Sequence, residues 1–113
     1  MKPIHKQAVT TALRAFIGQQ VYIHAEAIPG GFLRNISVEV EQAMIAGEGP
    51  YRVAIRIPYN GWIRMESLTH YISESEEKLL LAGHDEQGRI TTVLELSTRP
   101  FHFNKGGSVY DGS

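Results

Sequence analysis

The sequence predicts a mainly β fold: an antiparallel meander curled into a barrel-like sheet, with one N-terminal helix. Three observations predict it. Apolar residues follow a helical spacing only near the N-terminus, they alternate with polar residues from residue 21 to residue 96, and turn-forming residues interrupt this alternation repeatedly. Strands that recur every 8–12 residues or so, without helices between them, are typical of an antiparallel sheet that curls or closes.

The composition is that of one folded domain. The chain has 113 residues, of which 42% are hydrophobic and 20% charged, enough for a single hydrophobic core. We expect a β-rich domain over residues 1–103. The segment 104–113 is rich in glycine and poor in apolar residues, so we expect it to be a flexible C-terminal tail.

Charge and cysteine content exclude several classes of protein. The net charge is −1, with 11 basic and 12 acidic side chains, so no overall field draws the chain to nucleic acid or to an anionic membrane. The absence of cysteine excludes disulfides, thiolate nucleophiles and cysteine-based zinc sites. No apolar run has the length of a signal peptide or of a membrane span, so we expect a cytoplasmic protein.

Residues 4–17 form the predicted helix. Pro3 suits the start of a helix, and Gly18 suits a left-handed stop at its end. Such a helix must lay its apolar stripe on a sheet face. The stripe consists of Val9, Leu13, Phe16 and Ile17.

The strands follow in order, separated by clusters of turn residues. An irregularity in the alternation at 42–43 suggests a β-bulge. The predicted strands are 21–26, 36–41, 51–57, 62–68, 70–72, 78–83 and 90–96.

The hairpin around Asn60 is predicted in more detail. A two-residue loop would place charges on the apolar side, whereas a three-residue loop over 59–61 restores a consistent face. We therefore expect Gly61 in the left-handed position and Ile57 opposite Ile63, with Ile55 buried.

The outer face of this hairpin holds the principal candidate binding site. Arginines grip phosphate or carboxylate groups, and an indole stacks on rings, so the face fits a small anionic metabolite or a partner protein. The alternative is an ordinary solvated face, which every half-exposed antiparallel sheet carries. The candidate ligand-binding residues are Arg52, Arg56, Trp62, Arg64, Glu66 and, beside them, His84.

The histidines supply a second candidate site. No two of the five have metal-ligand spacing, so we expect no metal site and no cofactor. No nucleophile motif is present either, so no catalytic residue is assigned. A closed sheet would nevertheless bring His24, His70 and His84 together near Glu66. Gly83, just before His84, suits the close approach of another backbone or a ligand.

Several segments resemble the YojF-like family of bacilli. They are Val21-Tyr22-Ile23-His24, Gly49-Pro50-Tyr51-Arg52-Val53, Gly61-Trp62-Ile63, Glu66, Leu68-Thr69, Tyr71 and Ala82-Gly83-His84. The resemblance implies a mainly β architecture with little helix and a domain of unknown function. It also implies gene adjacency to a deacetylase of the bacillithiol pathway, which handles a low-molecular-weight thiol. No catalytic residue carries over from the family.

Three functions remain open. The first is a non-catalytic accessory protein that binds the bacillithiol-pathway deacetylase or a small anionic metabolite. The second is a small enzyme with a His/Glu acid–base or metal site. The third is weak binding of single-stranded nucleic acid, which the net charge disfavours. The edges of a small sheet must be covered or blunted, which is compatible with a homo-oligomer.

Overall fold

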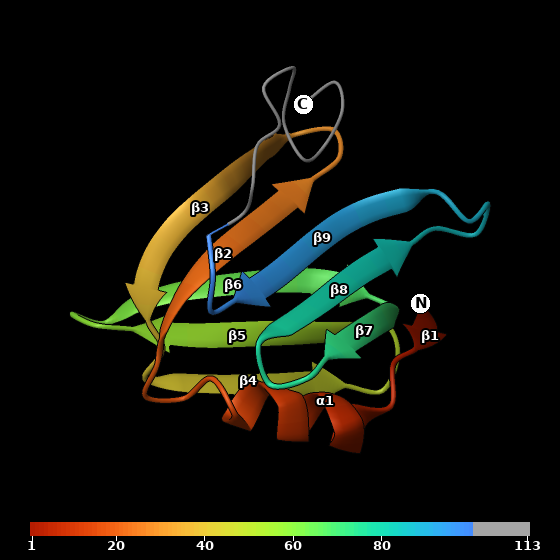
Figure 1. Ribbon diagram of the computed structural model, residues 1–113. Coiled ribbons are helices and arrows are strands. Elements are labelled where there is room, and N and C mark those ends of the chain that lie inside the picture. Colours follow the sequence, from red (N-terminus) through yellow and green to blue (C-terminus); the bar gives the residue numbers. More distant parts are fainter. Residues whose placement is uncertain (101–113) are drawn as a thin grey trace.

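The computed structural model describes residues 1–100, which form two antiparallel sheets and one short helix, α1 (Lys6–Arg14) (Figure 1). Sheet A has the strand order β1-β7-β8-β9-β2-β3, and sheet B has the order β4-β5-β6. The strands of sheet A are β1 (Lys2–Pro3), β2 (Gln20–Ala27), β3 (Gly31–Glu39), β7 (His70–Glu74), β8 (Lys78–His84) and β9 (Ile90–Ser97). Those of sheet B are β4 (Gln42–Gly47), β5 (Tyr51–Ile57) and β6 (Gly61–Leu68).

The core lies between the two sheets, with α1 closing one side along β4 and β7 (Figure 1). Alternate residues of each strand point inward, which is why the sequence alternates between apolar and polar residues. Each fully buried leucine, isoleucine or valine adds about 1.5–3 kcal/mol relative to exposure. The residues with no exposed surface include Val9, Leu13, Val21, Ile23, Val53, Ile55, Leu68, Leu79, Leu81, Leu94 and Leu96.

The mainly β, antiparallel prediction is confirmed, but the predicted barrel-like sheet is not. Within residues 1–100 neither sheet closes on itself, and the strands do not form one continuous meander. The chain leaves sheet A after Glu39 and enters sheet B at Gln42, so the irregularity at 42–43 marks a change of sheet and not a bulge. β9 then returns to pair with β2. The alternation reveals strands, but it carries no information about which strands pair.

The helix is shorter than predicted. It begins after His5, whose Nδ1 accepts a hydrogen bond from the Ala8 N–H at 3.2 Å, and Pro3 belongs to β1. Gly18 does adopt a left-handed conformation, with φ +87°, but it lies beyond the helix, after a series of turns. The apolar stripe is buried except for Ile17, which is 37% exposed.

The β5–β6 hairpin confirms the predicted faces and corrects the predicted loop. Ile57 lies opposite Gly61 and Ile55 lies opposite Ile63, so the loop spans residues 58–60. The left-handed positions belong to Tyr59 and Asn60, and not to Gly61. Relative to the predicted pairing, β6 is shifted by two residues, an even number, so the same residues still face the core. Ile55 is therefore buried, as expected, while Arg56 is exposed on the other face.

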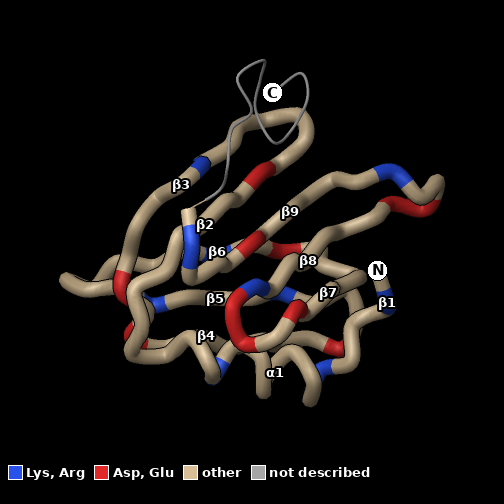
Figure 2. Tube along the Cα trace, viewed as in Figure 1, with Lys and Arg blue, Asp and Glu red and all other residues tan. Residues whose placement is uncertain are grey.

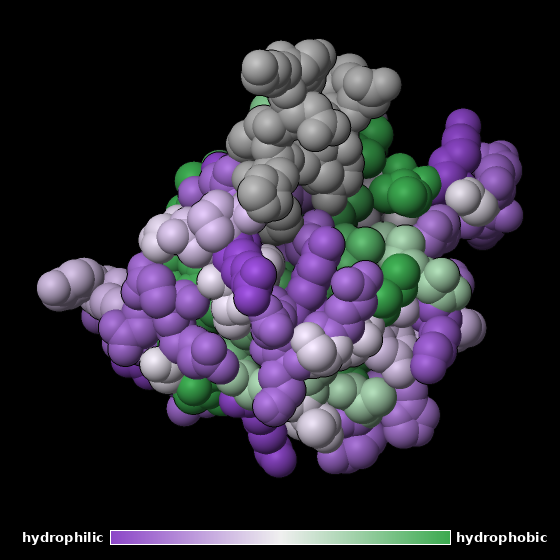
Figure 3. All heavy atoms as spheres, in the orientation of Figure 1, coloured by the Kyte–Doolittle hydropathy of each residue, from purple (hydrophilic) through white to green (hydrophobic). Residues whose placement is uncertain are grey.

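Both charge signs are interspersed along most of the chain, and the longest acidic stretch among residues 1–100 is the β7–β8 turn, with Glu74, Glu76 and Glu77 (Figure 2). Hydrophilic residues cover most of the face seen in Figure 3, and exposed hydrophobic residues gather along β9. Ile28 and Ile90, 44% and 42% exposed, lie where β2 turns away from β9. No helix in residues 1–100 is long and apolar enough to cross a membrane. The predicted tail, 104–113, lies outside the described residues.

Candidate functional site

The outer face of sheet B carries the arginine and tryptophan residues singled out in the sequence. In the β5–β6 register Arg56 lies opposite Trp62, and Ala54 lies opposite Arg64. Arg52 lies opposite Ala46 of β4 on the same face. These residues are together because the three strands form a regular meander, in which every second residue turns to the same side. This face is open to solvent.

Two of the three arginines have carboxylate partners. Arg56 Nε lies 3.4 Å from Glu41 Oε1, and Arg64 Nη2 lies 3.2 Å from Glu66 Oε2. Both pairs are largely exposed, so they fix side-chain direction more than they stabilise the fold. Arg52 forms no ion pair within residues 1–100. The face is therefore only mildly positive.

An apolar groove adjoins this face between β6 and the β2–β3 hairpin. It encloses about 550 Å³. Phe32 and Leu33 project from β3 and are 49% and 50% exposed, and the Arg34 guanidinium carbon lies 4.7 Å from the centre of the Phe32 ring. We name the groove and the adjoining side chains the Trp62 surface: Phe32, Leu33, Arg56, Trp62, Ile63, Arg64 and Met65.

Sequence reasoning missed the contribution of β3 to this surface. Phe32 and Leu33 are consecutive apolar residues directly after Pro29-Gly30-Gly31, where a regular strand with one buried face would alternate. This break in the apolar/polar alternation is the sequence feature that indicates an exposed apolar side chain on β3.

His84 lies apart from the arginine face, in contact with His70 and Thr69. The two imidazole rings meet edge to face, with centroids 4.6 Å apart. Thr69 Oγ1 lies 2.7 Å from His70 Nδ1 and 3.4 Å from His84 Nδ1, and it accepts a hydrogen bond from the His84 N–H at 3.0 Å. Thr69 Oγ1 also donates to the Ala82 carbonyl at 3.3 Å, so this one hydroxyl helps to fix the orientation of both rings.

A polar cleft of about 680 Å³ opens beside His84 at the β8–β9 turn. Asp85 dominates this turn: its Oδ1 accepts from the Gln87 and Arg89 N–H groups, and its Oδ2 lies 3.0 Å from Arg89 Nε. The Arg89 backbone N–H, together with the Arg89 side chain and the Gln87 N–H, lowers the pKa of Asp85. The carboxylate is thus engaged in shaping the turn, and its oxygens are already satisfied by the protein.

His24 is buried elsewhere in sheet A. Its Nε2 lies 3.4 Å from Glu26 Oε1, and it stands opposite Glu95 of β9, whereas His84 stands opposite Ile90 near the other end of that strand. Burial is the main cause that lowers the pKa of His24.

The four residues of the histidine hypothesis therefore do not share one site. The structure brings His70 and His84 together but not His24, and Glu66 pairs with Arg64 on the outer face of sheet B. Among residues 1–100, no group of three or more histidine, aspartate or glutamate side chains is arranged to hold a metal ion.

Comparison with known proteins identifies relatives over almost the whole chain. An uncharacterised protein of Bacillus subtilis, YojF, is 36% identical over 89% of this chain and 98% of its own length. The crystal structure of B. subtilis YojF matches the fold with a TM-score of 0.79 at 37% identity, covering 89% of this chain and 96% of that one. The family model described as a protein of unknown function, DUF1806, matches residues 3–101. The chain therefore belongs to the DUF1806 family.

Proposed function

We propose that the chain is a non-catalytic accessory protein that docks a partner protein on the Trp62 surface. The observation that carries the proposal is the cross-strand pair of Arg56 and Trp62. The two side chains stand opposite each other, 44% and 54% exposed, on a solvent-facing sheet beside an apolar groove. Tryptophan and arginine are the residue types that most often dominate the binding energy of protein interfaces.

The chemistry of the surface defines the partner that it fits. Phe32, Leu33 and Trp62 offer apolar area that gains free energy when it is covered, at about 25 cal/mol per Å². The flanking arginines favour carboxylates by forked hydrogen bonds. A partner that inserts an apolar side chain and sets a single carboxylate against Arg52, the arginine that Glu41 and Glu66 leave unengaged, is complementary to this surface.

A polyphosphate chain fits less well. Glu41 and Glu66 hold two of the three arginines, so a nucleic acid would have to displace these carboxylates or accept their repulsion. Proteins that bind single strands combine aromatic platforms with a positively charged groove. Trp62 and Phe32 supply exposed rings, but the positively charged groove is missing from the part of the chain that the structure describes, because two of the three arginines are paired with carboxylates. The charges therefore favour a protein partner.

We name the bacillithiol-pathway deacetylase as the first partner to test, and a cytoplasmic setting follows from that choice. The link rests on the family resemblance, while the geometry supports only the docking surface. Small anionic metabolites of the same pathway are the competing occupants of the arginine face. A homo-oligomer that uses the same apolar groove is a further competitor, because it would cover Phe32 and Leu33.

Isothermal titration calorimetry with the purified deacetylase tests the proposal. We expect binding by the wild type and a loss of at least about tenfold in affinity for Trp62→Ala, as for a residue at the centre of an interface. Tyr59→Ala is the matched control, because Tyr59 is also aromatic and exposed but lies at the loop tip. Arg56→Ala should weaken binding while leaving the melting temperature nearly unchanged.

Other outcomes would overturn the proposal. Equal affinity of the wild type and Trp62→Ala would rule out the Trp62 surface as the docking site. Absence of binding would rule out the deacetylase as the partner. Binding of the sugar-thiol metabolite alone, lost in Arg52→Ala, would replace the protein partner with a small ligand. Binding of a single-stranded oligonucleotide that falls steeply with added salt would favour the nucleic-acid alternative.

A further inference from the structure

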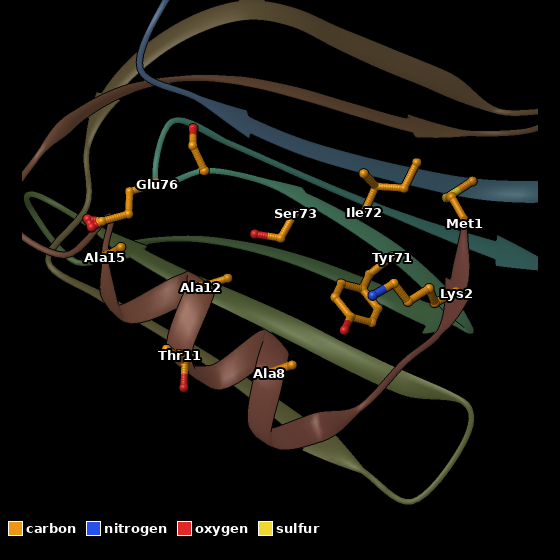
Figure 4. Close-up of a pocket in the computed structure, with 11 residues that line it drawn as sticks. Met1, Lys2, Ala8, Thr11, Ala12, Ala15, Tyr71, Ile72, Ser73 and Glu76 are labelled. Atoms are coloured by element: carbon orange, nitrogen blue, oxygen red, sulfur yellow. The ribbon is translucent and has the colours of Figure 1, made fainter.

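We propose that the groove between α1 and the edge of β7 binds an extended peptide, which adds as a strand to sheet A. The groove encloses about 710 Å³ and is lined by both elements (Figure 4). It shares no residue with the Trp62 surface, so either proposal can fail without the other. The lining residues are Met1, Lys2, Ala8, Thr11, Ala12, Ala15, Tyr71, Ile72, Ser73, Ser75 and Glu76.

The edge of β7 is only partly covered. β1 pairs with it over two residues, with Lys2 opposite Tyr71 and Pro3 opposite His70. The Ile4 N–H donates to the Thr69 carbonyl on the same edge. Backbone groups turn to the same edge at every second residue, so those of Tyr71 and Ser73 face this way too. Ser73 lies past the last β1 partner and has no strand beside it there within residues 1–100.

β1 itself shows that this edge accepts an added segment. Lys2–Pro3 is an exposed, two-residue antiparallel strand, and the groove continues past its first residue toward Glu76. A peptide in the same direction would pair with Ser73 and Glu74, where β7 ends, and its N-terminal part would follow the groove past the 75–77 turn. Strand addition of this kind uses backbone hydrogen bonds for affinity and pockets for alternate side chains for specificity. An uncovered edge of this type is otherwise a hazard for unwanted pairing.

The helix supplies the pockets. Ala8, Ala12 and Ala15 turn small side chains toward the groove, and all three are only partly buried (Figure 4). Larger side chains at these positions would fill the space between α1 and β7. The gap therefore accommodates apolar side chains from every second residue of an added strand, whose backbone would be held by the β7 edge.

Charge fixes the direction and the kind of peptide. Glu76 stands beside Ala15 at one end of the groove, and Lys2 stands beside Tyr71 at the other (Figure 4). A strand antiparallel to β7 would place its N-terminal end near Glu76 and its C-terminal end near Lys2. The occupant that fits is a short peptide with a basic residue first, alternating apolar residues, and an acidic residue last.

Two synthetic peptides, each acetylated and amidated, test this proposal on the full chain labelled with ¹⁵N. The first is Lys-Val-Thr-Val-Glu, short enough to lie between Glu76 and Lys2 beside the part of β7 that β1 leaves free, and the second exchanges its terminal lysine and glutamate. We expect the first to shift the amide signals of Ser73 and Ala12 in a saturable manner, and to bind at least about threefold more tightly than the second. A Glu76→Lys variant should reverse this preference, while Glu39→Lys, at the end of β3 on the opposite edge of sheet A, should not.

Ala12→Leu supplies the steric test, because the added side chain would occupy the groove. It should abolish binding, while Gln7→Leu, an exposed position of the same helix outside the groove, should leave it intact. Since Glu76→Lys is a surface change, it keeps the test valid if Ala12→Leu fails to fold. Absence of a saturable shift at Ser73, or equal binding of both peptides to Glu76→Lys and wild type, would overturn the proposal.

Discussion

Gly83 packs directly against the main-chain carbonyl of Ser67. A Cβ built at Gly83 would lie 2.1 Å from that oxygen and 2.4 Å from Thr92 Oγ1, closer than any real side chain comes. The contact joins β8 of sheet A to the end of β6 in sheet B. It occurs where Ser67 itself adopts a left-handed conformation, with φ +62°. The expectation of a close backbone approach at Gly83 is thus confirmed.

The first prediction follows from this contact. Gly83→Ala should lower the free energy of unfolding by about 3 kcal/mol, because backbone atoms of Ser67 must move to admit the methyl group. Urea denaturation followed by circular dichroism measures the change. Gly31→Ala is the control, since nothing lies within 4 Å of a Cβ there. A loss for Gly83→Ala no larger than for Gly31→Ala would show that the two sheets are not held together at this point.

The faces of the strands were predictable from sequence, and the pairing of sheets was not. Ile55 inside and Arg56 outside follow from alternation alone, because a strand has a period of two. The division into two sheets depends on β9 pairing with β2 over a long sequence separation. No local pattern encodes that choice, so the alternation predicts strands but cannot distinguish two sheets from a single barrel-like sheet.

The candidate site shows the same limit at the level of single residues. Arg56 and Trp62 were placed together correctly, because they belong to one hairpin. The partnership of His70 with His84 was anticipated only as part of a larger cluster, since it depends on how β7 and β8 align. Ala8 and Ala12 could not be identified as groove-lining residues from the sequence, because a small side chain leaves a groove only where the neighbouring elements leave the space unfilled.

The second prediction concerns Thr69. Thr69→Val removes the oxygen that accepts from the His84 N–H and contacts His70 Nδ1, while keeping the side-chain volume. We expect a loss of about 1–3 kcal/mol, the cost of leaving a partly buried donor without an acceptor. Chemical denaturation measures this loss. The imidazole ¹⁵N signals of His70 and His84 should shift together, whereas Thr10→Val should leave them in place. Unchanged imidazole signals in Thr69→Val would contradict the shared hydroxyl.

The third prediction is a decline in stability at mildly acidic pH because of His24. Burial holds the pKa of His24 below 6.5, the value expected in the unfolded chain. As the pH falls through 6.5 the unfolded state binds a proton first, so the free energy of unfolding decreases until the folded-state pKa is reached. Glu26 and Glu95 oppose this effect, whereas Arg34 acts with burial.

Two measurements check the His24 prediction. The melting temperature should fall between about pH 7.5 and pH 5, and by less in His24→Gln than in the wild type. The NMR titration of the His24 ring should have its midpoint below 6.5. A midpoint above that value would mean that the carboxylates outweigh burial and that stability rises, rather than falls, through this window.

The fourth prediction concerns the loop at the tip of the β5–β6 hairpin. Tyr59 has φ +66° and is fully exposed, so its side chain makes no contact that compensates for a left-handed backbone. That conformation costs a residue other than glycine about 1–2 kcal/mol, while glycine carries an entropic cost of about 0.5–1 kcal/mol. Tyr59→Gly should therefore stabilise the chain by about 0.5–1 kcal/mol, measured as a higher urea midpoint.

Asn60 provides the comparison within the same loop. It has φ +62°, but asparagine tolerates this region because its short polar side chain bonds locally, so Asn60→Gly should change stability little. Because Ile57 already pairs with Gly61, neither change should alter the hairpin register, and the amide signals of Ile55 and Ile63 should stay in place. If Tyr59→Gly instead destabilised the chain, the left-handed backbone at Tyr59 would carry no strain that glycine relieves.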